Sequence, residues 1–109
     1  MLVGSWRSDL ERGGFSLSVT EEFSADGAYL LRGHVCDTSE CIMLRVVGGW
    51  ELDASGGLEI SVTESNAPEF FPEGLAWRDE IASIGDGKLE YIDGCDGGTY
   101  QKERVGEPA

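Results

Sequence analysis

Apolar and polar residues alternate along most of the chain, which is the pattern of β-strands with one buried and one exposed face. In the clearest stretch, from Ile42 to Leu52, apolar residues or glycine occupy every second position. Gly, Asp and Asn cluster between the alternating stretches, and these residues favour tight turns. The pattern predicts eight strands, over residues 6–9, 15–24, 28–36, 42–52, 58–64, 75–84, 88–92 and 99–104.

Short connections between the predicted strands favour pairing of each strand with its neighbour in sequence. An antiparallel meander of eight strands closes naturally into a barrel. We therefore expect an all-β, up-and-down barrel, closed or nearly closed, formed by a single domain over residues 1–109 with 105–109 as a frayed tail. A β-sandwich of similar strands is the alternative, because periodicity does not separate the two.

Acidic residues dominate the charge of the chain, with 21 Asp and Glu against 8 Lys and Arg, a net charge of −13. Nucleic acids bind mainly through Lys and Arg that neutralise phosphates, so this charge argues against a nucleic-acid partner. Anionic membrane surfaces are disfavoured for the same reason. Because 40% of the residues are hydrophobic and regularly spaced, the acidity indicates a charged surface around a folded core rather than disorder.

No segment approaches the roughly 18 apolar residues of a membrane-spanning helix. The first residues also lack the basic and apolar regions of a signal peptide. The protein is therefore expected in the cytoplasm, or in the periplasm or outside the cell if Met1 stands in place of a signal peptide that has been removed.

The cysteines bear on this choice of compartment. Cys36 and Cys41 flank a predicted turn, where a disulfide would close the hairpin and imply an oxidising environment. The alternative is a pair of reduced thiols beside the turn. Cys95 has no predicted partner, and the lack of a CxxC pair or a Cys/His cluster argues against a zinc site.

Strand parity places several charged residues on the face that points into the barrel. Glu21, Glu64 and Asp79 are in phase with buried apolar neighbours, and a buried carboxylate is costly without a partner. One interpretation is a ligand pocket, in which these carboxylates orient a polar or cationic group beside Trp50 and Trp77. The ligand-binding candidates are Glu21, Arg32, Trp50, Glu64, Trp77 and Asp79.

Two alternatives apply to these candidates. In the first, the carboxylates lie near strand ends, where they reach water or pair with arginines. If a pocket is present, anionic ligands would meet an unfavourable potential there unless an arginine such as Arg32 turned inward. The inward aromatic residues, in turn, fill the interior of a small barrel as core rather than line a pocket.

Catalysis and cofactors find little support in the sequence. His34 is the only histidine, and no nucleophile motif stands beside it. The loop over residues 93–98 is rich in Asp and Gly but lacks the alternating ligands and the final Glu of a calcium-binding EF-hand loop. We therefore expect a protein that is not an enzyme and holds no metal or other cofactor.

Several short motifs stand out along the chain: Gly4-Ser5-Trp6 in the first strand, Thr20-Glu21-Glu22-Phe23 before Asp-Gly, Gly49-Trp50-Glu51-Leu52, Pro72-x-Gly74-x-x-Trp77, and Arg104 ending the last strand. Together they resemble the motifs of small bacterial lipocalin-like domains, which are barrels of the calycin type. The resemblance implies that Trp6 closes one end of the barrel and that Arg104 packs across its ring. The sequence departs from the family pattern in three ways: the chain is short, it has no predicted C-terminal helix, and it contains a second Gly-Trp.

The resemblance also implies a function. Proteins of this kind bind small hydrophobic or amphipathic ligands without catalysis, which is the expected role here. The alternative is a protein-interaction or structural barrel with a filled interior, acting through its acidic surface. An empty interior volume of roughly 300 Å³ or more favours the first reading, and the oligomeric state stays open.

Overall fold

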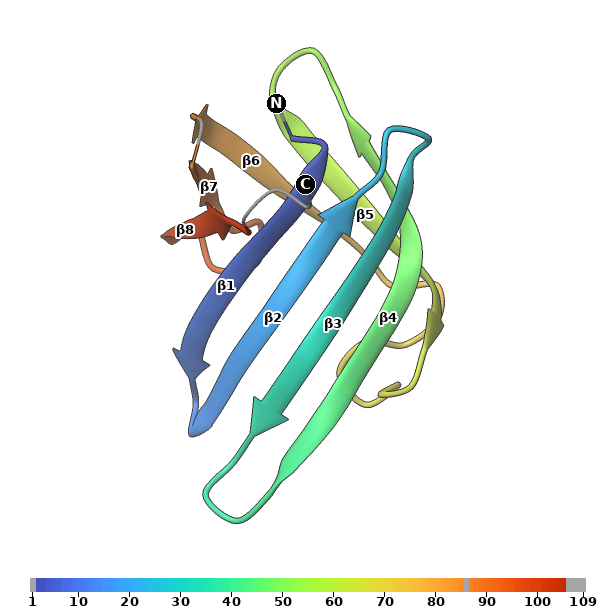
Figure 1. The fold of residues 1–109 in the computed structure, drawn as a ribbon, viewed down its shortest axis with the longest axis vertical. Coiled ribbons are helices and arrows are strands. Elements are labelled where there is room, and N and C mark those ends of the chain that lie inside the picture. Colours follow the sequence, from blue (N-terminus) through green and yellow to red (C-terminus); the bar gives the residue numbers. More distant parts are fainter. Residues whose placement is uncertain (1, 86, 106–109) are drawn as a thin grey trace.

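Eight antiparallel strands form one closed sheet in the computed structural model, which describes residues 2–85 and 87–105 (Figure 1). The strands are β1 (Gly4–Arg12), β2 (Phe15–Phe23), β3 (Ala28–Cys36), β4 (Cys41–Leu52), β5 (Gly57–Ser65), β6 (Ala76–Ile84), β7 (Lys88–Ile92) and β8 (Thr99–Arg104). Each strand pairs with the next, and β8 pairs with β1. The predicted all-β meander and its closure into a barrel are confirmed, and the sandwich alternative is wrong.

The strands form where the alternation predicts them, because the apolar parity of each strand faces the interior. The largest difference is β1, which runs over Gly4–Arg12 and pairs with β2 along its whole length. The predicted tail begins at Val105, whose backbone N–H still donates to the Ser5 carbonyl at 3.0 Å. The rest of that tail, residues 106–109, lies outside the described residues. Within the described part of the chain, no helix is long and apolar enough to cross a membrane.

The barrel is complete over only part of its length. β8 pairs with β1 at Trp6 and Arg7, near the start of β1. β6 pairs with β5 over Gly57–Ser61. Beyond these pairs, β1 to β4 continue as a long sheet toward the β1–β2 and β3–β4 turns, which lie at the bottom of Figure 1. The loop over residues 66–75, not a strand, faces this extension.

These two regions are called the closed half and the open half. The closed half holds the largest fully buried side chains, which are Trp6, Phe23, Tyr29, Val46, Leu58, Ile60 and Leu89. The open half is the extension of β1 to β4 with the facing loop, and its inward residues Leu10, Leu17, Val35 and Leu44 come from those four strands.

Trp6 and Arg104 cover the end of the closed half. The Arg104 guanidinium carbon lies 4.3 Å from the centroid of the Trp6 ring, and Trp6 Nε1 donates to the Leu2 carbonyl at 2.8 Å. Gly4 adopts a φ of +133°, where a Cβ would also meet Arg104 Nη1 at 2.5 Å, so glycine is needed there. The contact predicted between Trp6 and Arg104 is present, and such cation–π packing contributes about 0.5–2 kcal/mol.

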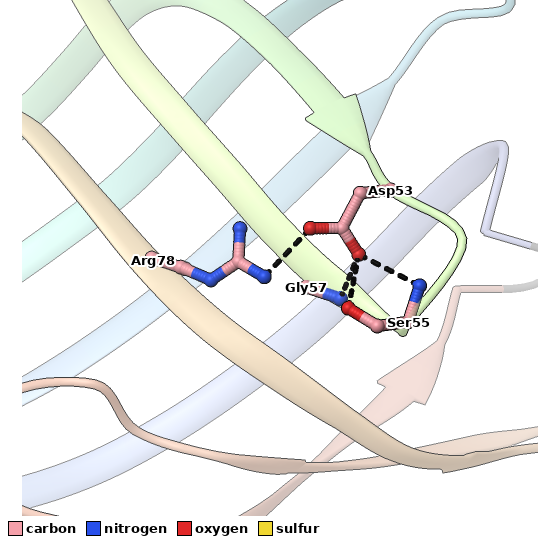
Figure 2. A network of polar contacts seen from close by, with 4 residues as sticks. All are labelled: Asp53, Ser55, Gly57 and Arg78. Carbon is pink, nitrogen blue, oxygen red and sulfur yellow. Dashed lines mark hydrogen bonds and ion pairs between the residues drawn. The ribbon is translucent and has the colours of Figure 1, made fainter.

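A hydrogen-bonded turn joins β4 to β5 at the same end of the barrel (Figure 2). Asp53 Oδ1 accepts from the N–H groups of Ser55 and Gly57 and from the Ser55 hydroxyl, and its Oδ2 accepts from Arg78 Nη2 at 2.6 Å. These donors, with the Ser55 hydroxyl and Arg78 foremost, hold the pKa of Asp53 well below its usual value. The carboxylate thereby ties the β4–β5 turn to β6.

A β-bulge interrupts the ladder between β4 and β5. Val47 pairs with Glu64 but the next residue, Gly48, pairs with Val62, so one residue of β5 is left over. A Cβ on Gly48 would lie 1.8 Å from the Ser61 carbonyl oxygen, which leaves room for glycine alone. Past the bulge the alternation of β5 shifts, which changes where Glu64 points.

Candidate ligand-binding site

An apolar pocket of about 410 Å³ opens in the open half of the barrel. Its walls are Leu10, Gly13, Phe15, Leu17, Val35, Leu44, Phe70 and Phe71. The residues from β1 to β4 form the floor, and the two phenylalanines of the loop over 66–75 form the opposite wall. The pocket therefore lies where the barrel lacks facing strands.

Asn66 anchors the loop over residues 66–75, which forms the wall opposite the floor of the pocket. Its side chain accepts from the backbone N–H of Arg45 at 2.8 Å and donates to the carbonyl of Met43 at 3.0 Å, so it imitates one more residue of sheet pairing on β4. Ala67, which follows, is buried. The Ala67 carbonyl then accepts from the backbone N–H groups of Phe70 and Phe71. This short turn places both aromatic rings over the pocket.

Two exposed aromatic rings meet at the mouth of the pocket. Phe15 and Phe70 contact each other edge to face, with ring centroids 5.9 Å apart. They remain 43% and 39% exposed, so the two rings together form an apolar patch at the surface. Exposed apolar surface around a concavity is typical of binding sites.

A smaller hollow of about 210 Å³ adjoins the apolar pocket. It shares Phe15, Val35 and Phe70 with that pocket, and its other walls include the acidic residues Asp37, Glu40 and Glu69. Asp37 accepts from the backbone N–H groups of Ser39 and Glu40 at 2.8 Å each, and these bonds lower its pKa. The mouth is therefore apolar on one side and negatively charged on the other.

The interior of the closed half contains a buried ion pair. Lys102 Nζ, on β8, donates to Glu21 Oε1 and lies 3.4 Å from the Ser8 hydroxyl. Tyr29 donates its hydroxyl to Glu21 Oε2 at 2.5 Å, and the Lys102 ammonium sits 4.5 Å from the centroid of the Tyr91 ring. The side chains of Lys102 and Glu21 are only 8% and 5% exposed. Both charges are thus satisfied inside the barrel.

The pKa values in this cluster follow from burial and from the two charges. Burial alone would lower the pKa of Lys102, but Glu21, together with Tyr91 and Asp79, raises that pKa overall. Burial raises the pKa of Tyr29 well above its usual value, and the Glu21 charge adds to the effect. Burial likewise raises the pKa of Asp79, although the Gly94 N–H donates to its Oδ1 at 3.1 Å and Lys102 is nearby.

The structure divides the carboxylates predicted to point inward. Glu21 and Asp79 are buried, as their parity indicated, and Glu21 pairs with a lysine. The inward placement of Glu64 is wrong: its side chain is 70% exposed and forms an ion pair with Arg45 at 3.8 Å. The bulge opposite Gly48 explains this, because the residue left over in β5 shifts the alternation by one.

Arg32 and the two candidate tryptophans also lie outside the apolar pocket. Arg32 does not turn inward; it is exposed and donates to Glu22 Oε1 at 3.2 Å on the outer face. Trp50 lies in the closed half, where its Nε1 donates to the Ser24 carbonyl at 2.9 Å. Of these three side chains, Trp77 lies nearest to the apolar pocket, because its ring centroid is 6.0 Å from that of Phe71, which lines the pocket. The predicted site residues therefore do not converge on one place.

Sequence reasoning missed Lys102 and most of the pocket walls. Lys102 shares the parity of Tyr100 and Arg104 on the last strand, and this signal could have placed it inside. Leu17, Val35 and Leu44 alternate as core residues do, whereas Leu10, Phe70 and Phe71 lie outside the strands that the sequence predicts. Nothing in the sequence tells that the sheet facing them ends early.

Two of the three cysteines lie at the β3–β4 turn, at the open half. The structure joins Cys36 and Cys41 in a disulfide across the β3–β4 turn, which was one of the two alternatives left open. Cys95 is an exposed free thiol in the β7–β8 turn. Among residues 2–85 and 87–105, no three His, Cys, Asp or Glu side chains are grouped in a way that could hold a metal ion.

The chain matches no protein-family model, and none of the curated proteins is similar to it at a significant level. The structure itself defines the class of protein, which is an eight-stranded, antiparallel, closed β-barrel with an apolar pocket at one end.

Proposed function

We propose that the protein is a lipocalin-like binding protein that holds a small hydrophobic or amphipathic molecule in the apolar pocket of the open half, without catalysis. The observation that carries this proposal is the pocket of about 410 Å³ lined by leucine, valine and phenylalanine. Its volume falls within the roughly 300–1,000 Å³ typical of small-molecule sites. Keeping such a surface open to water is unfavourable unless a ligand covers it.

The closed half is a poor place for the ligand. Trp6, Tyr29 and Leu58 are almost completely buried there. Lys102 already has Glu21 as its partner, so an anionic ligand would have to break a buried ion pair to use it. The closed half instead supports the lipocalin-like reading through Trp6 and Arg104, which close the barrel end in the manner the resemblance implies.

The alternative function, a protein-interaction barrel, would use the exposed Phe15 and Phe70 as part of a contact surface. The two functions differ in what fills the pocket. A small ligand needs the empty volume between β1–β4 and the loop, whereas a protein contact needs only the exposed rings. Filling the pocket from within therefore separates them.

The test uses 1-decanol, a neutral apolar probe, in a calorimetric titration of the wild type and two variants. Leu17→Trp places an indole in the pocket, whereas Met43→Trp adds the same bulk on the outer face of β4, where Met43 is 66% exposed. We expect saturable binding by the wild type and by Met43→Trp, and at least about a tenfold loss for Leu17→Trp, the equivalent of roughly 1.4 kcal/mol.

Thermal unfolding of each variant shows that it is folded before binding is compared. Lack of saturable binding by the folded wild type, or equal binding by Leu17→Trp, would contradict the proposed function.

A further inference from the structure

We propose that the pocket selects amphipathic cations, with the apolar part of the ligand between the leucines and phenylalanines and its positive group against Asp37, Glu40 and Glu69. This inference rests on the proposed function and names the class of ligand for the same site. An organic amine with a hydrocarbon or aromatic body is the simplest molecule with that chemistry.

The two compartments at the mouth match the two parts of such a ligand. The apolar pocket and the acidic hollow share the walls Phe15, Val35 and Phe70, so the two spaces adjoin on either side of these side chains. Two of the shared walls are aromatic rings, which also attract cations through their faces. A ligand that lies across Phe15 and Phe70 would therefore place its charged end among the carboxylates.

The carboxylates of the hollow are not neutralised by the described side chains. The ion pairs of the described residues join Arg7, Arg32, Arg45, Arg78 and Lys102 to Asp9, Glu22, Glu64, Asp53 and Glu21, respectively. None of these pairs includes Asp37, Glu40 or Glu69. The acidic hollow therefore keeps its negative potential, which the net charge of −13 reinforces.

Anionic amphiphiles lack a comparable partner in the site. The described side chains that line the pocket and the hollow are apolar or acidic. The buried ammonium of Lys102 is held by Glu21 in the closed half. A carboxylate or phosphate head group would meet repulsion at the mouth without an attractive contact further in.

The expected selectivity is moderate, because the three carboxylates are at the surface. A single exposed ion pair changes binding by no more than about fivefold, and salt weakens it. Several carboxylates around one cation act together at low ionic strength, where the screening length is about 30 Å, but not at about 1 M salt, where it is about 3 Å. Selectivity for the cation should therefore be moderate in dilute buffer and disappear in concentrated salt.

The test compares three probes with the same chain, namely decylamine, 1-decanol and decanoate, each below the concentration at which it forms micelles. In low salt we expect decylamine to bind at least about fivefold more tightly than 1-decanol, and decanoate more weakly than either. In about 1 M salt the three affinities should converge. The double variant Glu40→Gln/Glu69→Gln should lose about fivefold in decylamine affinity and keep its affinity for 1-decanol.

The matched control is Glu51→Gln/Glu59→Gln, which removes the same charge from residues beside the β4–β5 turn, in the closed half. It should bind decylamine as the wild type does. If the control loses as much affinity as the double variant of the hollow, or if decanoate binds most tightly, the inference is wrong while the binding function stands. If none of the three probes binds the folded wild type, the proposed function itself fails.

Discussion

The two halves of this barrel share the strands β1 to β4 but are completed differently. In the closed half, β5 to β8 complete the sheet, and the interior is filled by Trp6, Tyr29, Leu58 and other large side chains. In the open half, the loop over residues 66–75 replaces those strands and leaves an apolar pocket of about 410 Å³. The same pattern of alternating residues thus gives a packed core at one end and a binding surface at the other.

The treatment of charge differs in the same way. The closed half buries Lys102 with Glu21 and so neutralises its charges internally. The open half keeps its carboxylates at the surface around an apolar floor. We infer that the closed half mainly supplies stability and that the open half supplies recognition, and this division can be tested one residue at a time.

The largest expected effect is that of removing the buried ammonium. Lys102→Met leaves Glu21 buried without its cationic partner, and breaking a buried ion pair in this way costs about 3–5 kcal/mol of the free energy of unfolding. The double variant Glu21→Leu/Lys102→Met removes both charges and should recover most of the loss. Urea denaturation gives the free energy of unfolding of the wild type, the single variant and the double variant.

Arg45→Met is the matched control, because Arg45 pairs with Glu64 at the surface. It should cost less than about 1 kcal/mol. If Lys102→Met lowered the free energy of unfolding by no more than Arg45→Met does, the buried ion pair would contribute no more to stability than the exposed pair between Arg45 and Glu64.

The strands were predictable because each has one buried and one exposed face, and a period of two survives in the sequence wherever that is so. Lys102 shows the limit of this signal. A lysine in a strand is usually assigned to the outer face, and only its parity with Tyr100, together with an inward Glu21 to neutralise it, would have placed it inside. Burial of a charge depends on a partner that is distant in sequence.

The site was less predictable than the fold, for two physical reasons. Glu64 was misplaced because a bulge shifts the alternation, and the sequence marks that bulge only by the glycine Gly48. The pocket itself depends on where β6 and β8 end relative to β1, and residues such as Leu10 have the same pattern whether strands or a loop face them.

A second, smaller effect compares equal truncations in the two halves. Leu58→Ala removes a side chain that is 1% exposed in the closed half and should cost about 2–5 kcal/mol. Leu10→Ala removes the same atoms from the wall of an open pocket, so little new cavity forms and the cost should be about 1 kcal/mol or less. Equal losses in chemical denaturation would mean that the open half is packed like the closed one.

The smallest expected effect concerns Asp79 and has a defined pH dependence. Burial raises the pKa of Asp79, so its carboxyl binds a proton more tightly in the folded than in the unfolded chain. Its contribution to stability is therefore present at low pH and is lost as the pH rises through the folded pKa. Asp79→Asn should be more stable than the wild type at pH 7 by roughly 0.5–1 kcal/mol.

That gain should shrink as the pH falls and vanish only well below the ordinary Asp pKa of about 3.9, where the carboxyl is protonated in both states. Thermal unfolding at several pH values gives the comparison. Destabilisation by Asp79→Asn at neutral pH would indicate that attraction to Lys102 outweighs the cost of burying this carboxylate.

The most direct test of the division between the two halves is a methyl NMR titration of the protein with decylamine. We predict saturable shifts for the methyl groups of Leu10, Leu17, Val35 and Leu44, which line the pocket, and none above background for Leu58, Ile60 and Leu89 in the closed half. Saturable shifts centred on the closed-half methyl groups, or the absence of saturable shifts in both groups, would contradict the account.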